Sequence, residues 1–300
     1  MKLYPSLFLF GLAMTTAANA AVVNYVVTGY AAGSAAIVET GVGGTTDVTG
    51  ANASGGPTNT ILVAAGPTTY VDFTIGNADA IVGDKFLAAN INALPTVATL
   101  RVTLQAISAG GTELMIARTS NSQGLTDVGT ITLLLTGLGG VNVNTQVNSA
   151  TFGFEWRNSA NTAALGGSDS IIFSSYDIDF TQRNRIAVSD YSVIGTSTSP
   201  ATRLTTTTAL GTTTIVDPTP GTDSTFNDAR NAYAFMTVAG DNNQVISVDK
   251  AGNGVTGMGG NQLYMFTFRS PSPLIPAIPE PSAAIIACLG AVAMLRRRRI

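Results

Sequence analysis

The feature that most restricts the fold of this chain is the alternation of apolar and polar residues in its short segments. In VATLRVTLQAI (97–107), apolar residues at even positions from 100 to 106 alternate with polar residues at odd positions from 99 to 105. In TFGFEWR (151–157), aromatic residues at 152, 154 and 156 alternate with Gly153, Glu155 and Arg157. A period of two is that of a β-strand with one buried face.

Six further segments are predicted to be strands, and turn-rich sequences separate them. They are 69–75, 129–136, 170–180, 232–238, 243–249 and 262–269. The chain also holds 41 Thr and 32 Gly, which favour strands and turns over helices. The sequence therefore predicts an all-β domain over 21–269, with the architecture of a jelly-roll-like β-sandwich. A β-solenoid is the alternative, although no fixed repeat period is present.

Four segments carry weaker local predictions. DKFLAANIN (84–92) and TFNDARNAYA (225–234) have the composition of short helices. The low-complexity segment 196–214 is rich in Thr, which predicts an exposed loop or an edge hairpin. AGDNNQ (239–244) predicts a hairpin turn, because Asp and Asn tolerate the backbone conformations that turns require.

The N-terminus has the layout of a secretory signal peptide. Lys2 precedes an apolar run over 7–14, and Ala18-Asn19-Ala20 forms a small-x-small cleavage site. We expect signal peptidase to cleave after Ala20, which assigns 1–20 to the signal peptide. A buried N-terminal helix is the alternative, and Pro5 disfavours it.

The C-terminus combines an apolar segment with a basic cluster. Residues 282–295 carry no charge and are followed by Arg296, Arg297, Arg298 and Arg299. The segment is shorter than the roughly 20 residues of a typical span. Arginines nevertheless flank the cytoplasmic ends of spans, and the segment has no polar face. It is therefore predicted to be a single transmembrane helix rather than an amphipathic or buried one, with 270–278 as a Pro-rich spacer.

Pro279, Glu280 and Pro281 stand directly before this segment. The tripeptide, the span and the terminal arginines together resemble the PEP-CTERM sorting signal of Gram-negative bacteria, over residues 278–300. The family also shares the signal peptide, and the trailing Ile300 is the one departure. The resemblance implies that 279–300 is a sorting signal and that exosortase processes the protein. It also implies a precursor anchored in the inner membrane, delivery to the cell surface or extracellular matrix, and an association with exopolysaccharide and biofilm.

The charge balance restricts the partners of the domain. Without Lys2, Glu280 and the four terminal arginines, residues 21–279 carry 17 acidic and 10 basic side chains, a net charge of −7. Nucleic acid and anionic membrane surfaces require basic patches and are therefore disfavoured. The only cysteine, Cys288, lies in the predicted span, where a packing role is favoured over lipidation. The exported domain consequently has no disulfide.

The residue inventory argues against most catalytic chemistry. The chain has no His, which excludes Ser-His-Asp and Cys-His catalysis and the usual zinc sites. The Gly-rich segment 41–50 lacks the Lys and the strand-then-helix setting of a phosphate loop. Carboxylates remain, and Glu39, Glu113 and Glu155 are the only Glu residues of the domain. Glu155 has aromatic neighbours, as in sugar sites, but alternation turns it away from them, and pairing with Arg157 is the favoured interpretation. We therefore expect no enzymatic activity and no catalytic residue.

One cation site is conceivable. Asp177 and Asp179 lie two residues apart on a predicted strand and would share a face. With Asp169 or Asp190 nearby they could hold Ca²⁺, which prefers several oxygen ligands. The arginines at 183 and 185 could equally pair with them. No other cofactor is predicted.

Three functions are compatible with the sequence. The first is a structural or adhesive protein of the cell surface or matrix, favoured because no catalytic constellation is present. The second is a carbohydrate-binding module for exopolysaccharide, which would need an exposed strip of aromatic side chains. The third is a secreted glycan-active enzyme, which would need two carboxylates in a cleft.

Overall fold

The computed structural model describes the central part of the chain. The described residues are 22–33, 37–40, 59–63, 69–80, 94–107, 112–119, 130–137, 149–167, 169–176, 178, 181–198, 201–219, 229–250 and 262–269. They belong to one compact unit that runs from Val22 to Ile278. The signal peptide, the spacer and the sorting signal predicted above lie outside the described residues. Within the described ranges, no helix is long and apolar enough to cross a membrane.

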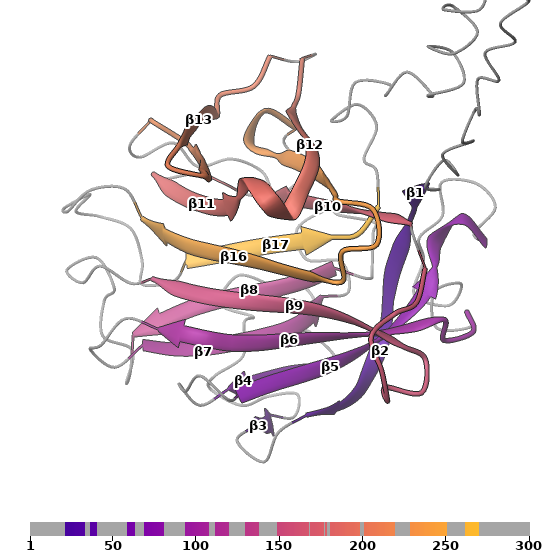
Figure 1. Cartoon of the computed structure of the whole chain (residues 1–300). Coiled ribbons are helices and arrows are strands. Elements are labelled where there is room, and N and C mark those ends of the chain that lie inside the picture. Colours follow the sequence, from indigo (N-terminus) through magenta and orange to yellow (C-terminus); the bar gives the residue numbers. More distant parts are fainter. Residues whose placement is uncertain are drawn as a thin grey trace, which may run out of the picture. The chain divides into compact units, whose positions relative to one another are not determined.

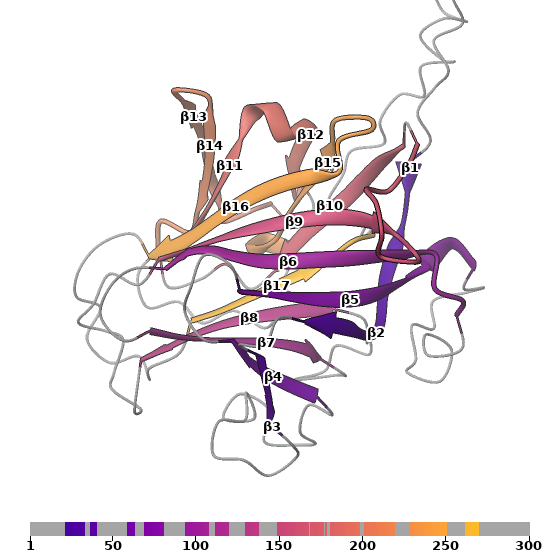
Figure 2. The ribbon, with the colours of Figure 1, turned by 60° about the horizontal axis from the view of Figure 1, so that its bottom comes forward.

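Two sheets contain the strands (Figures 1 and 2). Sheet 1 has, in spatial order, β13 (Thr205–Ala209), β14 (Thr212–Val216), β11 (Gln182–Ala187), β16 (Asn243–Lys250), β9 (Ala150–Asn158), β6 (Ala98–Ile107), β5 (Thr69–Asn77) and β2 (Tyr25–Gly33). Sheet 2 has β12 (Tyr191–Thr196), β15 (Tyr233–Thr237), β10 (Ser170–Tyr176), β17 (Gln262–Thr267), β8 (Thr130–Gly137), β7 (Thr112–Thr119), β4 (Asn59–Val63) and β3 (Ile37–Thr40). Described helix is limited to the 3-10 turns η2 (Ala78–Ala80), η5 (Val188–Asp190) and η6 (Ala229–Asn231).

The chain passes repeatedly from one sheet to the other. The two strand orders given above can be compared position by position. At each position, the strand of sheet 1 and the strand of sheet 2 are consecutive in the sequence, as for β9 and β8 or β16 and β17. Among the described strands, the consecutive ones that pair within one sheet are β3–β4, β5–β6, β7–β8 and β13–β14. All described pairings are antiparallel except that of β1 (Val22–Val23) with β10. The all-β sandwich is confirmed, and the antiparallel pairing excludes the β-solenoid.

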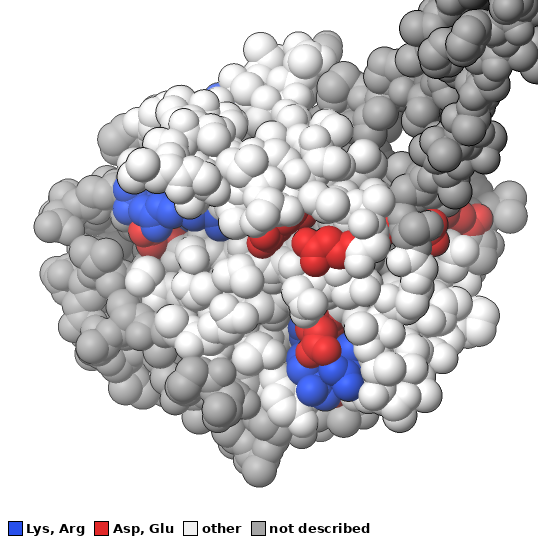
Figure 3. Space-filling model, in the orientation of Figure 1, with Lys and Arg blue, Asp and Glu red and all other residues white. Residues whose placement is uncertain are grey.

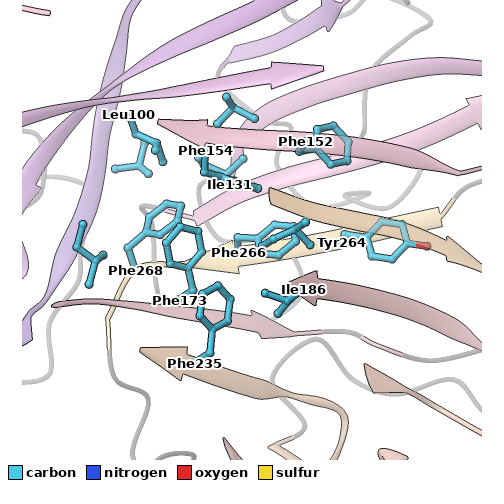
Figure 4. Close-up of a cluster of buried hydrophobic side chains, with 14 of the residues drawn as sticks. Leu100, Ile131, Phe152, Phe154, Phe173, Ile186, Phe235, Tyr264, Phe266 and Phe268 are labelled. Atoms are coloured by element: carbon cyan, nitrogen blue, oxygen red, sulfur yellow. The ribbon is translucent and has the colours of Figure 1, made fainter. Parts of the chain in front are cut away.

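The core lies between the two sheets and is rich in aromatic rings (Figure 4). The ring of Trp156 from sheet 1 meets those of Phe173 from sheet 2 and of Phe268, which follows β17, edge-on at centroid distances of 5.9 and 5.0 Å. The indole N–H of Trp156 donates to Oε1 of Gln244 at 3.0 Å, so its polar atom is satisfied inside the core. Burying each such ring contributes about 1.5–3 kcal/mol. Alternation in the strands therefore creates one continuous apolar layer.

The start of the domain joins the two sheets at one corner. Val22 and Val23 pair with β10 of sheet 2, whereas β2 pairs with β5 of sheet 1. Between them, the backbone N–H of Tyr25 donates to the carbonyl of Phe268 at 2.6 Å. The Tyr25 ring also stacks on Trp156 at 5.1 Å. This short segment therefore fastens both sheets to each other.

The strand predictions hold for every segment that was named. The eight predicted segments correspond to β5, β6, β8, β9, β10, β15, β16 and β17. Strand β10 ends at Tyr176, earlier than the predicted 180. The prediction of an edge hairpin within 196–214 is also confirmed, since β13 and β14 form one.

Two local predictions are wrong. Of the predicted helix over 225–234, only residues 229–234 are described, and they form the 3-10 turn η6 and the start of β15 at Tyr233 instead of an α-helix. Tyr233 lies in the core, where burial of its ring outweighs local propensity. The turn at 239–244 exists, with Gly240 at φ 76°, but it links β15 of sheet 2 to β16 of sheet 1 and is not a hairpin. The segment 84–92 lies outside the described residues.

Candidate functional site: the charged clusters of the outer face of sheet 1

Alternation turns every second residue of sheet 1 away from the core. The register aligns Asp72 of β5, Arg101 of β6 and Glu155 of β9 in one row across the sheet. Figure 3 shows that charged side chains gather in a few separate places on this face, which is otherwise uncharged. We call the group around this row the Asp72 network. Its members are Tyr70, Asp72, Arg101, Glu155, Arg157 and Asn161.

Asp72 and Arg101 form a two-point ion pair at the centre of the network. Nε and Nη2 of Arg101 donate to the two carboxylate oxygens of Asp72, each at 2.8 Å. Asp72 is only 1% exposed. The guanidinium also lies 4.0 Å above the centroid of the Tyr70 ring. The pKa of Arg101 is raised above its ordinary value, mainly because Asp72 accepts its hydrogen bonds.

Asn161 links this pair to a second arginine. Its side-chain N–H donates to Oδ2 of Asp72 at 2.7 Å, while its Oδ1 accepts from Nε of Arg157 at 2.6 Å. Asn161 has a left-handed backbone with φ 58°, which Asn tolerates better than most residues. The turn is held further by Asn158, whose Oδ1 accepts from the N–H of Thr162 at 2.9 Å. The side-chain amide of Asn161 therefore hydrogen-bonds both the carboxylate of Asp72 and the guanidinium of Arg157.

Glu155 behaves as its sequence neighbourhood predicts. Nη1 of Arg157 donates to Oε1 of Glu155, so the carboxylate is ion-paired. Its sequence neighbours Phe154 and Trp156 are buried on the opposite face of β9. The interpretation of Glu155 as a partly solvated partner of Arg157 is therefore confirmed. Side-chain burial is not described for Glu39 and Glu113.

A second group on the same face is the Asp249 cluster, which consists of Arg183, Arg185 and Asp249. Nε and Nη2 of Arg183 donate to the two oxygens of Asp249 at 2.7 and 3.0 Å. Nη1 of Arg185 donates to Oδ2 of the same carboxylate at 2.7 Å. Strand pairing creates this geometry, because β11 and β16 are neighbours with Arg183 opposite Asp249. The arginines thus bind an aspartate distant in sequence.

The described residues do not test the calcium prediction. Asp177 and Asp179 both lie outside the described ranges. Asp190 accepts from the N–H of Val245 at 3.0 Å and from Ser189, while Asp169 is exposed. Within the described part of the chain, no three residues of the His, Cys, Asp and Glu types form a metal-binding group.

The outer face of sheet 1 presents paired charges and hydroxyl groups. Both clusters hold their carboxylates in ion pairs with guanidinium groups. Among side chains whose burial is described, no Phe, Tyr or Trp is exposed, so this part of the chain has no aromatic platform. The remaining outer-facing groups are largely hydroxyls, which can accept and donate hydrogen bonds.

Sequence reasoning missed most members of these clusters. It identified the Glu155–Arg157 pair, which is local, and the outward orientation of Arg101. It did not identify Asp72, Asn161 or Asp249, whose partners are distant in the sequence. The available signal was the position of Asp72 between apolar residues in TYVDFTI (69–75), since a charge there needs a partner on a neighbouring strand.

No family model matches the chain, and no curated protein matches it by sequence. Among solved structures, the chain is similar to the N-terminal domain of the Streptococcus gordonii adhesin Sgo0707, with a TM-score of 0.49 and 8% sequence identity. That likeness covers 85% of this chain and 65% of the other, so the chain spans less than two thirds of that structure. It is also similar to the adhesin domain of PrgB from Enterococcus faecalis, with a TM-score of 0.42 and 10% identity over 82% of this chain and 88% of that one.

Proposed function

We propose that the chain is an exported protein of the bacterial cell surface or extracellular matrix, with a structural or adhesive role in the envelope or biofilm. The ends of the sequence support export and sorting. The signal-peptide pattern ends at Ala18 and Ala20, and Pro279-Glu280-Pro281 precedes an apolar segment and four arginines. In this proposal a membrane helix over 282–295 holds the precursor in the inner membrane of a Gram-negative cell. Exosortase then processes it and releases a jelly-roll-like domain.

The surface chemistry of the outer face of sheet 1 supports the structural or adhesive role in this proposal. Its arginines are ion-paired within the Asp72 network and the Asp249 cluster, and the Asp249 cluster keeps one excess positive charge. Around them the face presents short hydroxyl side chains. These include Thr74, Thr103, Thr151, Thr207, Thr212, Thr214 and Ser247. A hydrated face with internally paired charges projects a weak field and suits a passive coat or an uncharged partner.

The two alternatives receive less support. A carbohydrate-binding module would use exposed aromatic rings for stacking, whereas no aromatic ring whose burial is described is exposed, and Tyr70 on the outer face lies against Arg101. A glycan-active enzyme would need two carboxyl groups facing each other across a cleft, whereas Glu155 is paired with Arg157. We therefore retain the surface or matrix role as the proposal.

Fractionation of cells combined with mass spectrometry of the mature termini tests this proposal. We expect the protein in the surface or matrix fraction, with an N-terminus at Ala21 and a C-terminus near residues 279–281. A matched variant lacking 279–300 should lose this location, because the predicted membrane stop and the sorting motif are both removed. An uncut protein in the cytoplasm, or an unchanged location of the truncated variant, would contradict the proposal.

A further inference from the structure

Strand β13 is an edge of sheet 1 that lacks the usual protection against pairing. All five of its residues, Thr205–Ala209, are exposed. The strand contains no charge and no proline, and its five pairs with β14 show no register shift. The opposite edge, β2, has two register shifts, and the sheet 2 edge β12 has one. Bulges, charges and prolines are the means by which edges avoid other strands, so β13 is the open edge.

The hairpin turn determines which backbone groups of β13 are free. Leu210 and Gly211 form a two-residue turn with φ of 50° and 76°, the pattern of a type I′ hairpin. In such a hairpin the flanking pair, Ala209 with Thr212, is hydrogen-bonded, and bonded pairs then alternate along the strands. Thr206 and Thr208 therefore direct their N–H and C=O groups away from β14, toward the free edge.

The edge is also held in place before any partner arrives. The hydroxyl of Thr208 hydrogen-bonds that of Thr213 at 2.8 Å, and Thr213 in turn bonds the hydroxyl of Tyr191 at 2.5 Å. Because Tyr191 belongs to sheet 2, this chain of hydroxyls ties the hairpin to both layers. A partner strand would consequently meet an ordered edge and would lose little additional conformational entropy of the hairpin.

We propose that β13 pairs antiparallel with β13 of a second copy of this chain. This pairing joins sheet 1 of one copy to sheet 1 of the other, edge to edge. Thr207 of the two copies lies at the two-fold axis, and Thr206 of each copy lies opposite Thr208 of the other. This register places the free N–H and C=O groups of both strands opposite each other and forms four main-chain hydrogen bonds.

The sequence of β13 indicates that its partner strand is a second β13. An uncharged run of threonines is complementary to itself in the antiparallel direction, because each central Thr meets another Thr, and cross-strand Thr pairs are favourable. A two-fold arrangement uses the same edge on both copies and therefore closes as a dimer. An interface of one short strand per copy is small, so we expect a weak, concentration-dependent dimer. This inference is independent of the export and location proposed above.

Disulfide trapping tests the pairing and its register in the full chain, solubilised in detergent, with Cys288→Ala as the background. Residues of a non-bonded antiparallel pair have Cα atoms about 4.5 Å apart, which a disulfide can span. Thr207→Cys should therefore give a covalent dimer under mild oxidation. Thr214→Cys, on the same face of β14 opposite Thr207, is the matched control and should stay monomeric. Failure of Thr207→Cys to cross-link, or equal cross-linking of both variants, overturns the proposal.

A charge-swap experiment supplies a second readout that does not depend on oxidation. Thr207→Lys places two like charges at the two-fold axis and should abolish the dimer in sedimentation experiments, as should Thr207→Glu. Mixing the two variants should restore association. Thr214→Lys adds the same charge beside the edge and should retain the dimer, while circular dichroism verifies that each variant is folded. A wild-type chain that sediments only as a monomer overturns the proposal, as does association that Thr207→Lys leaves unchanged.

Discussion

The Asp72 network and the Asp249 cluster each surround a buried aspartate on the outer face of sheet 1, but with different partners. Asp72 receives two bonds from one arginine and a third from the neutral amide of Asn161. Asp249 is shared by two arginines of one strand, Arg183 and Arg185. The first arrangement is balanced and closely packed, whereas the second has an excess positive charge that water must screen. Ion pairs of similar geometry are therefore expected to contribute differently to the free energy of unfolding.

Asp72→Ala is expected to have the largest effect. The substitution removes a carboxylate that is 1% exposed and leaves Arg101 and Asn161 without their acceptor. We expect a loss of about 2–4 kcal/mol in the free energy of unfolding. Urea unfolding followed by the fluorescence of the single tryptophan, the buried Trp156, measures it.

The matched control for that experiment is Asp79→Ala. Asp79 is exposed and accepts one hydrogen bond from Asn24 at 2.9 Å. Its loss should change stability by no more than about 0.5 kcal/mol. If the two aspartate variants unfolded at the same urea concentration, the Asp72 network would not be a source of stability.

Asp249→Ala is expected to have a smaller effect that depends on salt. The side chains of Arg183 and Arg185 are 29% and 33% exposed, so solvent weakens both their attraction to Asp249 and their repulsion after its loss. We expect a loss of about 1–2 kcal/mol at low salt, which shrinks as ionic strength rises toward about 0.5 M. Adding Arg185→Met to this variant should recover part of the loss. An identical loss at all salt concentrations would contradict the repulsion argument.

A third carboxylate, Asp217, extends the comparison because no arginine among the described residues hydrogen-bonds to it. Oδ1 accepts from the N–H of Thr219 at 2.9 Å, while Oδ2 is buried and has no hydrogen-bond partner within the described ranges. Burial raises its pKa above the ordinary value of 3.8, and the Thr219 hydrogen bonds and the charge of Arg203 reduce that shift. Folding therefore disfavours its ionised form. Its contribution to stability falls as pH rises from about 3.8 through the raised folded pKa.

Asp217→Asn should remove this pH dependence and has the smallest expected effect of the three substitutions. The stability of the variant relative to the wild type should increase between acidic and neutral pH, because only the wild type ionises at this position. Urea unfolding of both proteins over that pH range measures the difference. If the difference in stability stayed constant with pH, or changed in the opposite direction, ionising Asp217 would cost no more free energy in the folded state than in the unfolded state.

Local patterns explain why part of the fold could be predicted. Strands such as β6 and β9 have one apolar and one polar face, so their sequences alone identify them. Strand β11 was missed because Asn184 occupies an inward position. There its amide donates to Ser175 and Tyr233, at 3.1 and 3.0 Å. A buried polar residue whose partners lie elsewhere in the sequence breaks the alternation that prediction uses.

The clusters and the strand order depend on contacts that no local pattern contains. Arg101 and Asp72 are 29 residues apart, and Asn161 lies 89 residues from Asp72. The turn at 239–244 has the same chemistry whether it closes a hairpin or crosses between sheets. Only the competition among all strands for neighbours decides which of the two forms.

The hydrogen bond between Tyr25 and Phe268 also has a consequence for the time course of folding. Tyr25, at the start of β2, cannot form this bond until Phe268 has been synthesised, although β2 itself pairs with β5. At about 5–20 residues per second, synthesis of the intervening chain takes roughly 12–50 s. During that interval the aromatic segments have no complete core to enter, and contacts of such long range also form slowly. A chain of this topology therefore depends on being kept from aggregation until synthesis has passed Phe268.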